Sequence, residues 1–467
     1  MRIAVIGSGI SGLGSAYLLN QQADVHLFEC DSRIGGHSHT VDADFNGVKV
    51  PVDTGFIVYN PLNYPNLMAL FDRLNVPWIN TDMSFAVSLR DGGCEYEGSL
   101  RGLVAQPGNL LRPRYWAMLA DLVRFYCTGY KNAFAGPAGE SLNEFLLREG
   151  YGEAFVQDHL LPMGASIWSC SAAMMRDYPV RSLLQFLENH QLLNFIERPV
   201  WRTVKGGSRE YVNRIAGTLG GIKGGQIHLN TQITGLRRDQ GGVILSIAGE
   251  GDVWFDKVVL AAHADQSLAL ISDASQQERS ILADFRFQPN RAVLHSDPAL
   301  MPNRRAAWGA WNYIGAKDSI GAKDSGGAKD SGGAKDSIGV KDSGGGALCL
   351  TYWMNRLQSI DPAYPLFETL NPHFEPDPAL VHGSYSYDHP VFDEKAVAAQ
   401  HRLRQIQGVG NLFYAGAWTG HGFHEDGLKS AIAVARTLGV EIPWETTIQP
   451  YSQIEGNALQ NDTREIA

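Results

Sequence analysis

Between residues 2 and 29, the apolar and polar positions predict a strand, a helix and a second strand. An apolar run from residue 2 leads into the turn GSGISG, a helical pattern follows over 10–21, and the short apolar segment DVHLFE ends at Glu29. A helix between two such strands is typical of a parallel βαβ unit. The sequence therefore predicts a doubly wound α/β domain.

The turn in this unit has the glycine spacing of a dinucleotide-binding turn. Gly7 permits the tight turn, Gly9 lets the backbone approach a pyrophosphate, and Gly12 allows close packing of helix on strand. Ser11 lies in the same turn, at the helix N-terminus that would face the phosphates. Glu29 is placed to accept ribose hydroxyls, and an acidic residue there argues against a ribose 2′-phosphate.

Later segments predict further strands and helices. Strands are expected around Ile227 and Ile233, at 257–264 and at 411–415, the last followed by a loop and a helix that begins near Asp426. The other regions predict a hairpin around Asp91, helices at 113–127, 141–149 and 180–190, and neighbouring strands at 306–314 and 347–355.

One predicted helix has two interpretations. The segment LLRPRYWAMLADLVRFYC interleaves arginines with aromatic residues. It either packs its aromatic face into its own domain or lies as an interfacial helix on lipid. The packed helix is the simpler interpretation.

Residues 315–344 contain five copies of a hexapeptide related to GAKDSG. A left-handed β-helix also uses six-residue units, but only two of these copies offer a large aliphatic residue. A flexible loop between neighbouring strands is the better interpretation, because a long loop closes at modest entropic cost. We expect it to be exposed and to take no part in the chemistry.

Composition agrees with a large enzyme. The chain has 467 residues and 44% hydrophobic content, enough for extensive cores in two domains. A net charge of −10 disfavours nucleic acid as a partner. The five cysteines form no CxxC pair, no signal segment is recognisable, and no apolar run reaches membrane-spanning length, so a cytoplasmic location is expected. Peripheral membrane contact stays open, as does the oligomeric state.

The stretch from Glu29 to His37 carries a more specific resemblance. Glu29, five residues and the Gly35–Gly36 doublet resemble the signature of the flavin amine oxidase, protoporphyrinogen oxidase and phytoene desaturase superfamily. The strings VDTGFIVYN at 52–60 and GFHEDGLKSA at 422–431 resemble bacterial flavin-containing, amine oxidase-like proteins of that superfamily. The resemblance implies FAD, and the absence of cysteine from 411–431 implies that it is held non-covalently.

The resemblance also implies which residues contact the cofactor. Gly36 would bring backbone N–H groups to the pyrophosphate, while His37 replaces the usual arginine and Ala417 replaces the usual acidic residue. The backbone near Ile233 would contact the adenine, and the positive end of the C-terminal helix would face the flavin pyrimidine ring. The remaining implied cofactor residues are Thr54, Gly55, Phe56, Gly416, Asp426, Gly427 and Leu428.

The expected architecture is a Rossmann-like FAD-binding domain interleaved with an α+β substrate domain. We assign 1–80, 200–262 and 408–445 to the FAD-binding domain, and 81–199 and 263–407 to the substrate domain. The repeat at 315–344 and a tail at 446–467 belong to neither.

Candidates for the chemistry are two aromatic residues and a histidine. By resemblance to amine oxidases, Phe423 would form one wall of an aromatic cage and either Tyr385 or Tyr387 the other, and His424 is a candidate proton-transfer group. Each is otherwise a structural residue. The run from His421 to Asp426 lacks HExxH spacing and its acids suit a helix start, so we expect no metal.

Three functions remain open. The first is an FAD-dependent oxidoreductase that oxidises or desaturates a largely apolar, fatty-acyl substrate by hydride transfer to flavin N5. The second is an amine oxidase that produces an imine and hydrogen peroxide, although the superfamily's lysine near N5 has no recognisable counterpart. The third is a non-catalytic flavin-binding protein. The partner is a small molecule or lipid in the first two cases.

Overall fold

The computed structural model describes residues 1–194, 199–220, 224–315 and 348–445. The chain divides into two units. Unit 1 combines Met1–Thr81, Asn189–Gln288 and Asp388–Ala467, and unit 2 combines Asp82–Glu188 and Pro289–Tyr387. Nearly all of the hexapeptide repeat and the whole 446–467 tail lie outside the described residues, so the predictions for them stay predictions.

Unit 1 is built on a five-stranded parallel sheet. Its strands lie in the order β10 (Gln226–His228), β2 (Asp24–Phe28), β1 (Arg2–Ile6), β14 (Lys257–Leu260) and β20 (Leu412–Tyr414). In the centre, Ile3 lies opposite Val25 on one side and Lys257 on the other. Stretches far apart in the chain thus form one sheet, and the predicted interleaved α/β fold class is confirmed.

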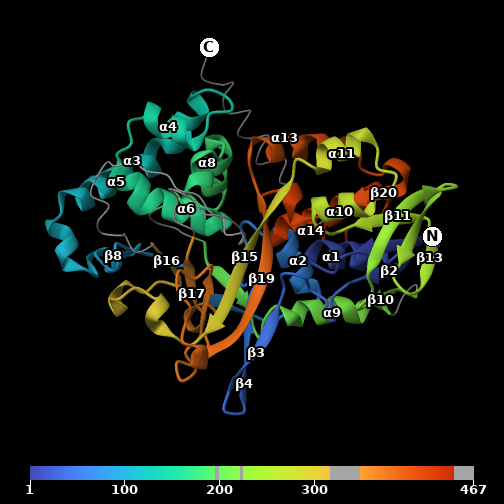
Figure 1. Ribbon diagram of the computed structural model, residues 1–467, viewed down its shortest axis with the longest axis horizontal. Coiled ribbons are helices and arrows are strands. Elements are labelled where there is room, and N and C mark those ends of the chain that lie inside the picture. The colour runs from blue at the N-terminus through green and yellow to red at the C-terminus, as the bar shows by residue number, and fades with distance from the viewer. Residues whose placement is uncertain (195–198, 221–223, 316–347, 446–467) are drawn as a thin grey trace, which may run out of the picture. The chain divides into compact units, whose positions relative to one another are not determined.

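Both faces of this sheet are covered, which explains its continuous apolar strands. Ile3 and Val5 face a core formed with four helices, whereas Ala4 and Ile6 face a second core. The helices on the first face are α1 (Ile10–Leu19), α2 (Pro65–Arg73), α9 (Arg209–Leu219) and α14 (His424–Thr437). Figure 1 shows the C-terminal helix α14 beside the N-terminal helix α1.

The second face carries an antiparallel sheet and three helices. The strands are β11 (Ile233–Asp239), β12 (Gly242–Ile247) and β13 (Gly251–Phe255), and the helices are α10 (Ala264–Leu270), α11 (Gln276–Leu282) and α13 (Glu394–Arg402). Two small sheets complete unit 1: the hairpin β3 (Thr40–Phe45) with β4 (Val48–Asp53), and β5 (Val58–Tyr59), β9 (Trp201–Val204) and β6 (Trp78–Thr81).

The extent of unit 1 differs from the expected bounds in three stretches and at Thr81. Thr81, the stretch that begins at Asn189, and residues 263–288 and 388–407 were expected in the substrate domain, yet they belong to unit 1. The reason is packing, because Ala264, Leu282 and Ala396 are buried in the second core of the parallel sheet.

Unit 2 contains a seven-stranded mixed sheet. The order is β19 (Val381–Val391), β15 (Arg286–His295), β18 (Phe367–Leu370), β17 (Leu350–Trp353), β16 (Trp311–Ile314), β7 (Phe85–Leu89) and β8 (Cys94–Glu97). The predicted hairpin is β7 with β8, and the strands that flank the repeat are antiparallel neighbours, with Tyr313 opposite Leu350. They are shorter than predicted, because Arg305–Ala307 forms a 3-10 turn and Met354–Leu357 forms helix α12.

Apart from α12, the α-helices of unit 2 lie between β8 and residue 189. They are α3 (Pro113–Ala135), α4 (Leu142–Arg148), α5 (Glu153–Phe155), α6 (Leu161–Trp168), α7 (Ala172–Arg176) and α8 (Val180–Asn189), preceded by the 3-10 turns η1 (Gly102–Val104) and η2 (Pro107–Leu111). A single π-helical turn, Val156–Leu160, precedes α6. Among the described residues, no helix combines the length and apolarity that crossing a membrane requires.

Candidate cofactor site

The N-terminus of α1 is open toward a ligand. The N-cap residue Gly9 provides no side-chain cap and the first turn contains no acidic residue. A Cβ built on Gly9 would meet no atom within 4 Å. Space is therefore left beside the helix N-terminus, where backbone N–H groups and the positive end of the helix dipole suit a phosphate group.

Two other glycines shape this turn for different reasons. Gly7 adopts a φ of +99°, and its N–H donates to the carbonyl of Phe28 at 2.9 Å. A Cβ on Gly12 would lie 1.8 Å from the carbonyl oxygen of Gly7, so only glycine lets α1 approach the strand this closely. The predicted roles of these two glycines agree with this geometry.

Glu29 places its carboxylate against the glycine-rich turn. Its Oε2 accepts hydrogen bonds from the Ser8 N–H at 3.0 Å and from the Ser8 hydroxyl at 2.5 Å. Its Oε1 accepts from the Asp31 N–H at 3.0 Å. A half-buried carboxylate at the end of β2 is thus held beside the turn, in position to accept further hydroxyl groups.

The Gly35–Gly36 doublet docks onto the same turn. The N–H of Gly35 donates to the Ser8 carbonyl at 3.1 Å and lies 3.2 Å from the Ser8 hydroxyl oxygen. A Cβ on Gly36 would be 2.9 Å from the Cα of Gly9, and both residues of the doublet have positive φ angles. The Gly35–Gly36 doublet, which the resemblance assigns to the pyrophosphate, therefore forms one surface with the glycine-rich turn before α1.

The N-terminus of α14 lies beside the N-terminus of α1. A Cβ on Gly427 would be 2.7 Å from a methyl carbon of Ile10 and 2.9 Å from the hydroxyl oxygen of Ser11. Leu428 is fully buried, and its side chain packs against Gly14 of α1. The Leu428 side chain therefore packs α14 against α1, so a ligand can contact Leu428 only through its backbone.

The loop before α14 is also closely packed. The N–H of Gly416 donates to the Ser430 hydroxyl at 2.9 Å, and the Trp418 indole N–H donates to the Ala262 carbonyl at 3.1 Å. Ala417 lies 3.8 Å from the position of a Cβ on Gly427. This loop thus connects β20 to the paired helix N-termini.

Residues 37–39 and 54–56 run side by side. The Phe56 N–H donates to the His37 carbonyl at 2.8 Å, and the Thr54 N–H donates to the His39 carbonyl at 2.9 Å. A Cβ on Gly55 would be 2.1 Å from the His37 carbonyl oxygen, so this approach requires glycine. The structure therefore brings together two segments that the resemblance had assigned separately to the cofactor.

His424 joins this group through its ring. It stacks on Phe56 with a centroid distance of 3.6 Å and an interplanar angle of 14°. Its Nε2 lies 2.9 Å from the Ser38 hydroxyl and 3.2 Å from the Tyr211 hydroxyl, and these two hydroxyl groups also contact each other. Burial lowers the pKa of His424 to about 3, so the imidazole is neutral and shares a hydrogen bond with a hydroxyl group at Nε2.

The two acids after His424 serve as helix caps. Glu425, which is buried, accepts from the Asn66 and Leu67 N–H groups at 3.1 and 3.0 Å, at the start of α2. Asp426 accepts from the Phe423 N–H at 3.1 Å at the start of α14. Burial raises the pKa of Glu425 to about 7, although Lys429 and the hydrogen bonds oppose this shift. In the described part of the chain, no three His, Cys, Asp or Glu side chains are grouped to bind a metal.

Three further histidines gather near this group, and sequence reasoning missed His263. The His37 ring centroid lies 5.7 Å from that of His389 and 6.4 Å from that of His263, and His263 stacks on Phe287 at 4.2 Å. Burial lowers the pKa of all three, to about 4 for His389 and well below the usual range for His37. His263 follows β14, and the carboxyl end of a parallel strand is the signal that could have identified it.

The surroundings of three other predicted residues, Phe423, Ile233 and Tyr387, are as follows. Phe423 packs against the first core of unit 1, 5.8 Å from the ring of His190. Ile233 is a buried residue at the start of β11, and the Thr231 N–H next to it donates to the Glu29 carbonyl at 2.9 Å. Tyr387 is a buried residue of β19 in unit 2, and its place opposite Phe423 stays a prediction.

A parallel sheet whose strand ends carry two adjacent helix N-termini, a glycine doublet and a positioned carboxylate is an arrangement that suits a nucleotide cofactor. The family model described as "Flavin containing amine oxidoreductase" matches residues 10–285, more than half of the chain. The chain belongs to this family and is a flavin-containing oxidoreductase. The predicted superfamily is confirmed.

Solved structures share the fold at low identity. A fatty acid isomerase from P. acnes that produces CLA is 18% identical with a TM-score of 0.59, covering 93% of this chain and 98% of its own. Putrescine oxidase bound to putrescine is 13% identical with a TM-score of 0.63, covering 94% and 100%. A putative protoporphyrinogen oxidase from Exiguobacterium is 14% identical with a TM-score of 0.60, covering 94% and 99%. No curated protein sequence matches this chain.

Proposed function

We propose that this protein binds FAD non-covalently and uses it to oxidise or desaturate a largely apolar, fatty-acyl substrate. The observation that carries the cofactor part is the meeting of three elements at one place: the open N-terminus of α1, the Gly35–Gly36 doublet and the Glu29 carboxylate. Each suits a different part of a dinucleotide, whereas FMN, which has no adenosine, would leave the carboxylate without a ribose.

The chain's own residues fit this cofactor. The N–H groups at the start of α1 would hold the pyrophosphate, Glu29 would accept the adenosine ribose hydroxyls, and the start of α14 near Gly427 would direct its positive end at the flavin pyrimidine ring. Bound flavin would supply a two-electron acceptor that takes a hydride from the substrate at N5. The protein's own work is to orient the substrate and to exclude water.

The electrostatics of the group around Phe56 favour an apolar substrate. Its histidines are neutral at physiological pH, because burial lowers their pKa values. The two carboxylates at the start of α14 are engaged in helix capping, since Glu425 caps α2 and Asp426 caps α14. Neutral histidines around Phe56 suit an acyl chain better than an ammonium group, which requires a carboxylate or an aromatic cage.

The solved structures that share the fold support a second candidate function. They include a fatty acid isomerase and two kinds of amine oxidase, which act on putrescine and cyclohexylamine according to their names. Amine oxidation is therefore the alternative, and it would need Phe423 to form one wall of an aromatic cage. A third candidate function is a non-catalytic one, in which the flavin is structural or acts as a sensor.

Anaerobic flavin reduction distinguishes these functions. The purified protein would be mixed with unsaturated fatty acids and acyl lipids in one series, and with primary amines and diamines in another. We expect only the first series to bleach the flavin spectrum. Bleaching by amines alone would identify an amine oxidase, and a flavin that neither series reduces would contradict both enzymatic functions.

The cofactor is tested separately. Acid precipitation should release all the flavin into the supernatant, where mass analysis should find FAD. Flavin that stays on the protein pellet would contradict non-covalent binding. All five cysteines are free thiols, which agrees with the reducing cytoplasm in which we propose that the protein works.

A further inference from the structure

We propose that residues 100–116 of unit 2 form a docking surface for an anionic membrane. This segment comprises η1, η2 and the first turn of α3, and is called the 100–116 surface below. The proposal goes beyond the proposed function and does not rest on it, because binding to a bilayer requires neither flavin nor turnover.

The 100–116 surface exposes an unusual amount of apolar side chain. Leu100 is 88% exposed, Leu111 87% and Trp116 55%, and Val104 and Leu110 are also exposed. Val123, seven residues after Trp116 and so on the same face of α3, is 50% exposed and extends this surface. Single exposed leucines are ordinary, but a group of this kind in one short segment marks an interaction site.

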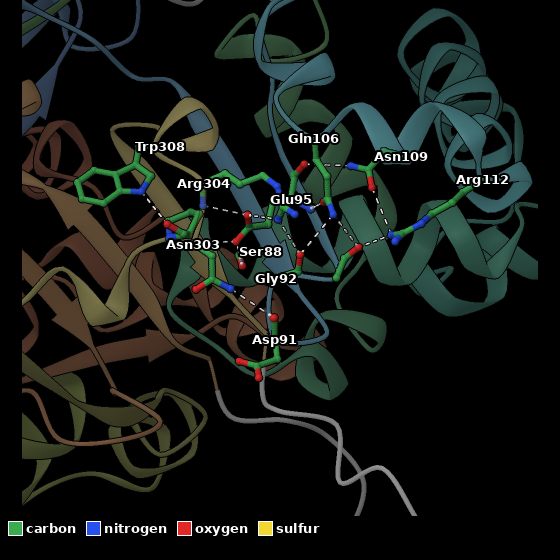
Figure 2. A network of polar contacts seen from close by, with 12 residues as sticks. Ser88, Asp91, Gly92, Glu95, Gln106, Asn109, Arg112, Asn303, Arg304 and Trp308 are labelled. Atoms are coloured by element: carbon green, nitrogen blue, oxygen red, sulfur yellow. Dashed lines mark hydrogen bonds and ion pairs between the residues drawn. The ribbon is translucent and has the colours of Figure 1, made fainter.

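The inner side of the segment is held firmly to the β7–β8 hairpin. Figure 2 shows Gln106 and Asn109 pointing at Glu95 of β8. The Gln106 Oε1 accepts from the Glu95 N–H at 2.7 Å, and the Asn109 amide donates to the Glu95 carbonyl at 3.0 Å. The fully buried Glu95 carboxylate in turn accepts from the Ser88 hydroxyl at 2.9 Å and from the Arg304 guanidinium at 2.9 Å.

Two more hydrogen bonds join the parts of the surface to one another. The Trp116 indole N–H donates to the Leu110 carbonyl at 2.8 Å, and the Tyr115 hydroxyl donates to the Leu103 carbonyl at 2.9 Å. Polar groups thus face inward and are satisfied, while the leucines face outward. The exposed leucines are presented by an ordered framework, so little conformational entropy is lost when they are buried in a partner.

The charge of the surface is positive although the chain carries −10 overall. Arg101, Arg112 and Arg114 are exposed, and residues 99–120 include no acidic residue. Arg114 shares the single buried carboxylate of Asp158 with Arg90, so this pair of arginines keeps a net positive charge. Arg112 donates only to neutral oxygens, those of Gly93 and Asn109, in its described contacts.

Apolar side chains surrounded by arginines with a tryptophan among them match the interface of an anionic bilayer. The leucines and Trp116 would enter the acyl boundary while the guanidinium groups contact lipid phosphates. A second copy of the chain fits less well, because an isologous dimer would place the same arginines of both copies against each other.

Vesicle flotation of the holoprotein tests the proposal. We expect binding to vesicles of phosphatidylcholine with phosphatidylglycerol, weaker binding to phosphatidylcholine alone, and release by salt. The double variant Leu100→Ser, Leu111→Ser should lower the partition coefficient at least about tenfold, since each leucine loses its burial in lipid. Arg101→Glu should lower binding to the anionic vesicles about tenfold, because it reverses one charge.

The matched control is Leu147→Ser, which removes a leucine that is 74% exposed on α4, outside the surface. It should bind as the wild type does, and all variants should keep the wild-type flavin content and thermal transition. Wild-type protein that stays with neither vesicle type, or a double variant that floats like the wild type, would overturn the proposal. A wild-type dimer that the double variant dissociates would assign the surface to self-association and would overturn it as well.

Discussion

The carboxylate of Glu425, on the first turn of α14, accepts a hydrogen bond from the backbone N–H of Leu67 at 3.0 Å, 358 residues away in the chain. The start of α2 has no side-chain cap from its own N-cap residue, Tyr64. Glu425 therefore caps a helix other than its own. The acidic run at the start of α14 thus holds α14 against α2, and it thereby positions the loop that precedes α14.

Glu425→Ala should destabilise the protein by about 2–3 kcal/mol, because it leaves the buried N–H groups of Asn66 and Leu67 without an acceptor. Urea denaturation followed by circular dichroism would measure the loss. Glu441→Ala, at an exposed position of the same unit, is the control and should change the unfolding free energy by less than about 0.5 kcal/mol. If the two variants have the same free energy of unfolding, Glu425 does not stabilise the protein as a helix cap.

Glu29→Ala should lower the affinity for FAD by one to two orders of magnitude, or about 1.5–3 kcal/mol, because a charge-assisted acceptor for ribose hydroxyls is lost. Glu29→Gln should have an intermediate effect. Fluorescence titration of the apoprotein with FAD would give the dissociation constants. Glu250→Ala, an exposed glutamate in the turn between β12 and β13, is the control. An unchanged dissociation constant for Glu29→Ala would mean that the dinucleotide lies elsewhere.

Phe423→Ala should lower turnover at least tenfold, a loss of about 1.4 kcal/mol in transition-state stabilisation, while FAD stays bound at full stoichiometry. The phenyl ring is half-buried at the start of α14, whereas the contacts of Gly7 and Gly12 lie on other elements. Stopped-flow flavin reduction would measure the rate. Phe374→Ala, at a phenylalanine that is 41% exposed in unit 2, is the control. If flavin in Phe423→Ala is reduced at the wild-type rate, the Phe423 ring has a purely structural role.

The protein should lose stability as the pH falls below about 6.5. Burial lowers the pKa of His39 and His389 to about 4 and that of His424 to about 3, so the folded state holds them neutral while the unfolded state takes up protons. Their contribution is complete above pH 6.5 and is lost progressively toward pH 4. His389 and His424 should each account for roughly 1–2 kcal/mol between pH 7.5 and pH 5, and the half-exposed His39 for less, because solvent screens it. Glu425, whose pKa burial raises to about 7, opposes part of this loss.

Urea denaturation at several pH values tests this dependence. His389→Gln should flatten the curve between pH 7.5 and pH 5, whereas His401→Gln, at an exposed histidine of α13, should leave the slope as in the wild type. The same pKa values imply that flavin reduction shows no titration of His424 between pH 5.5 and 7.5. A wild-type stability that does not change over this range would contradict the buried, neutral histidines.

Local patterns sufficed for several elements of the fold. The glycine spacing from Gly7 to Gly12 predicted the strand, turn and helix, because steric limits at each glycine are local. The helix predicted to begin near Asp426 begins at His424, since the Asp426 carboxylate reaches back to the Phe423 N–H and extends the first turn. The helix predicted at 113–127 continues to Ala135, because Gly136 provides the first strong stop.

The sequence by itself determined the doubly wound unit, the dinucleotide turn, the acidic strand end and the superfamily, because each depends on residues close together in the chain. Only the tertiary structure decided that residues 263–288 and 388–407 cover the parallel sheet, that Glu425 caps α2, and that the rings of His37, His263 and His389 gather in one place. These relationships join residues more than a hundred positions apart. Their partners are selected by packing and by the burial of polar groups, which no local pattern of the chain records.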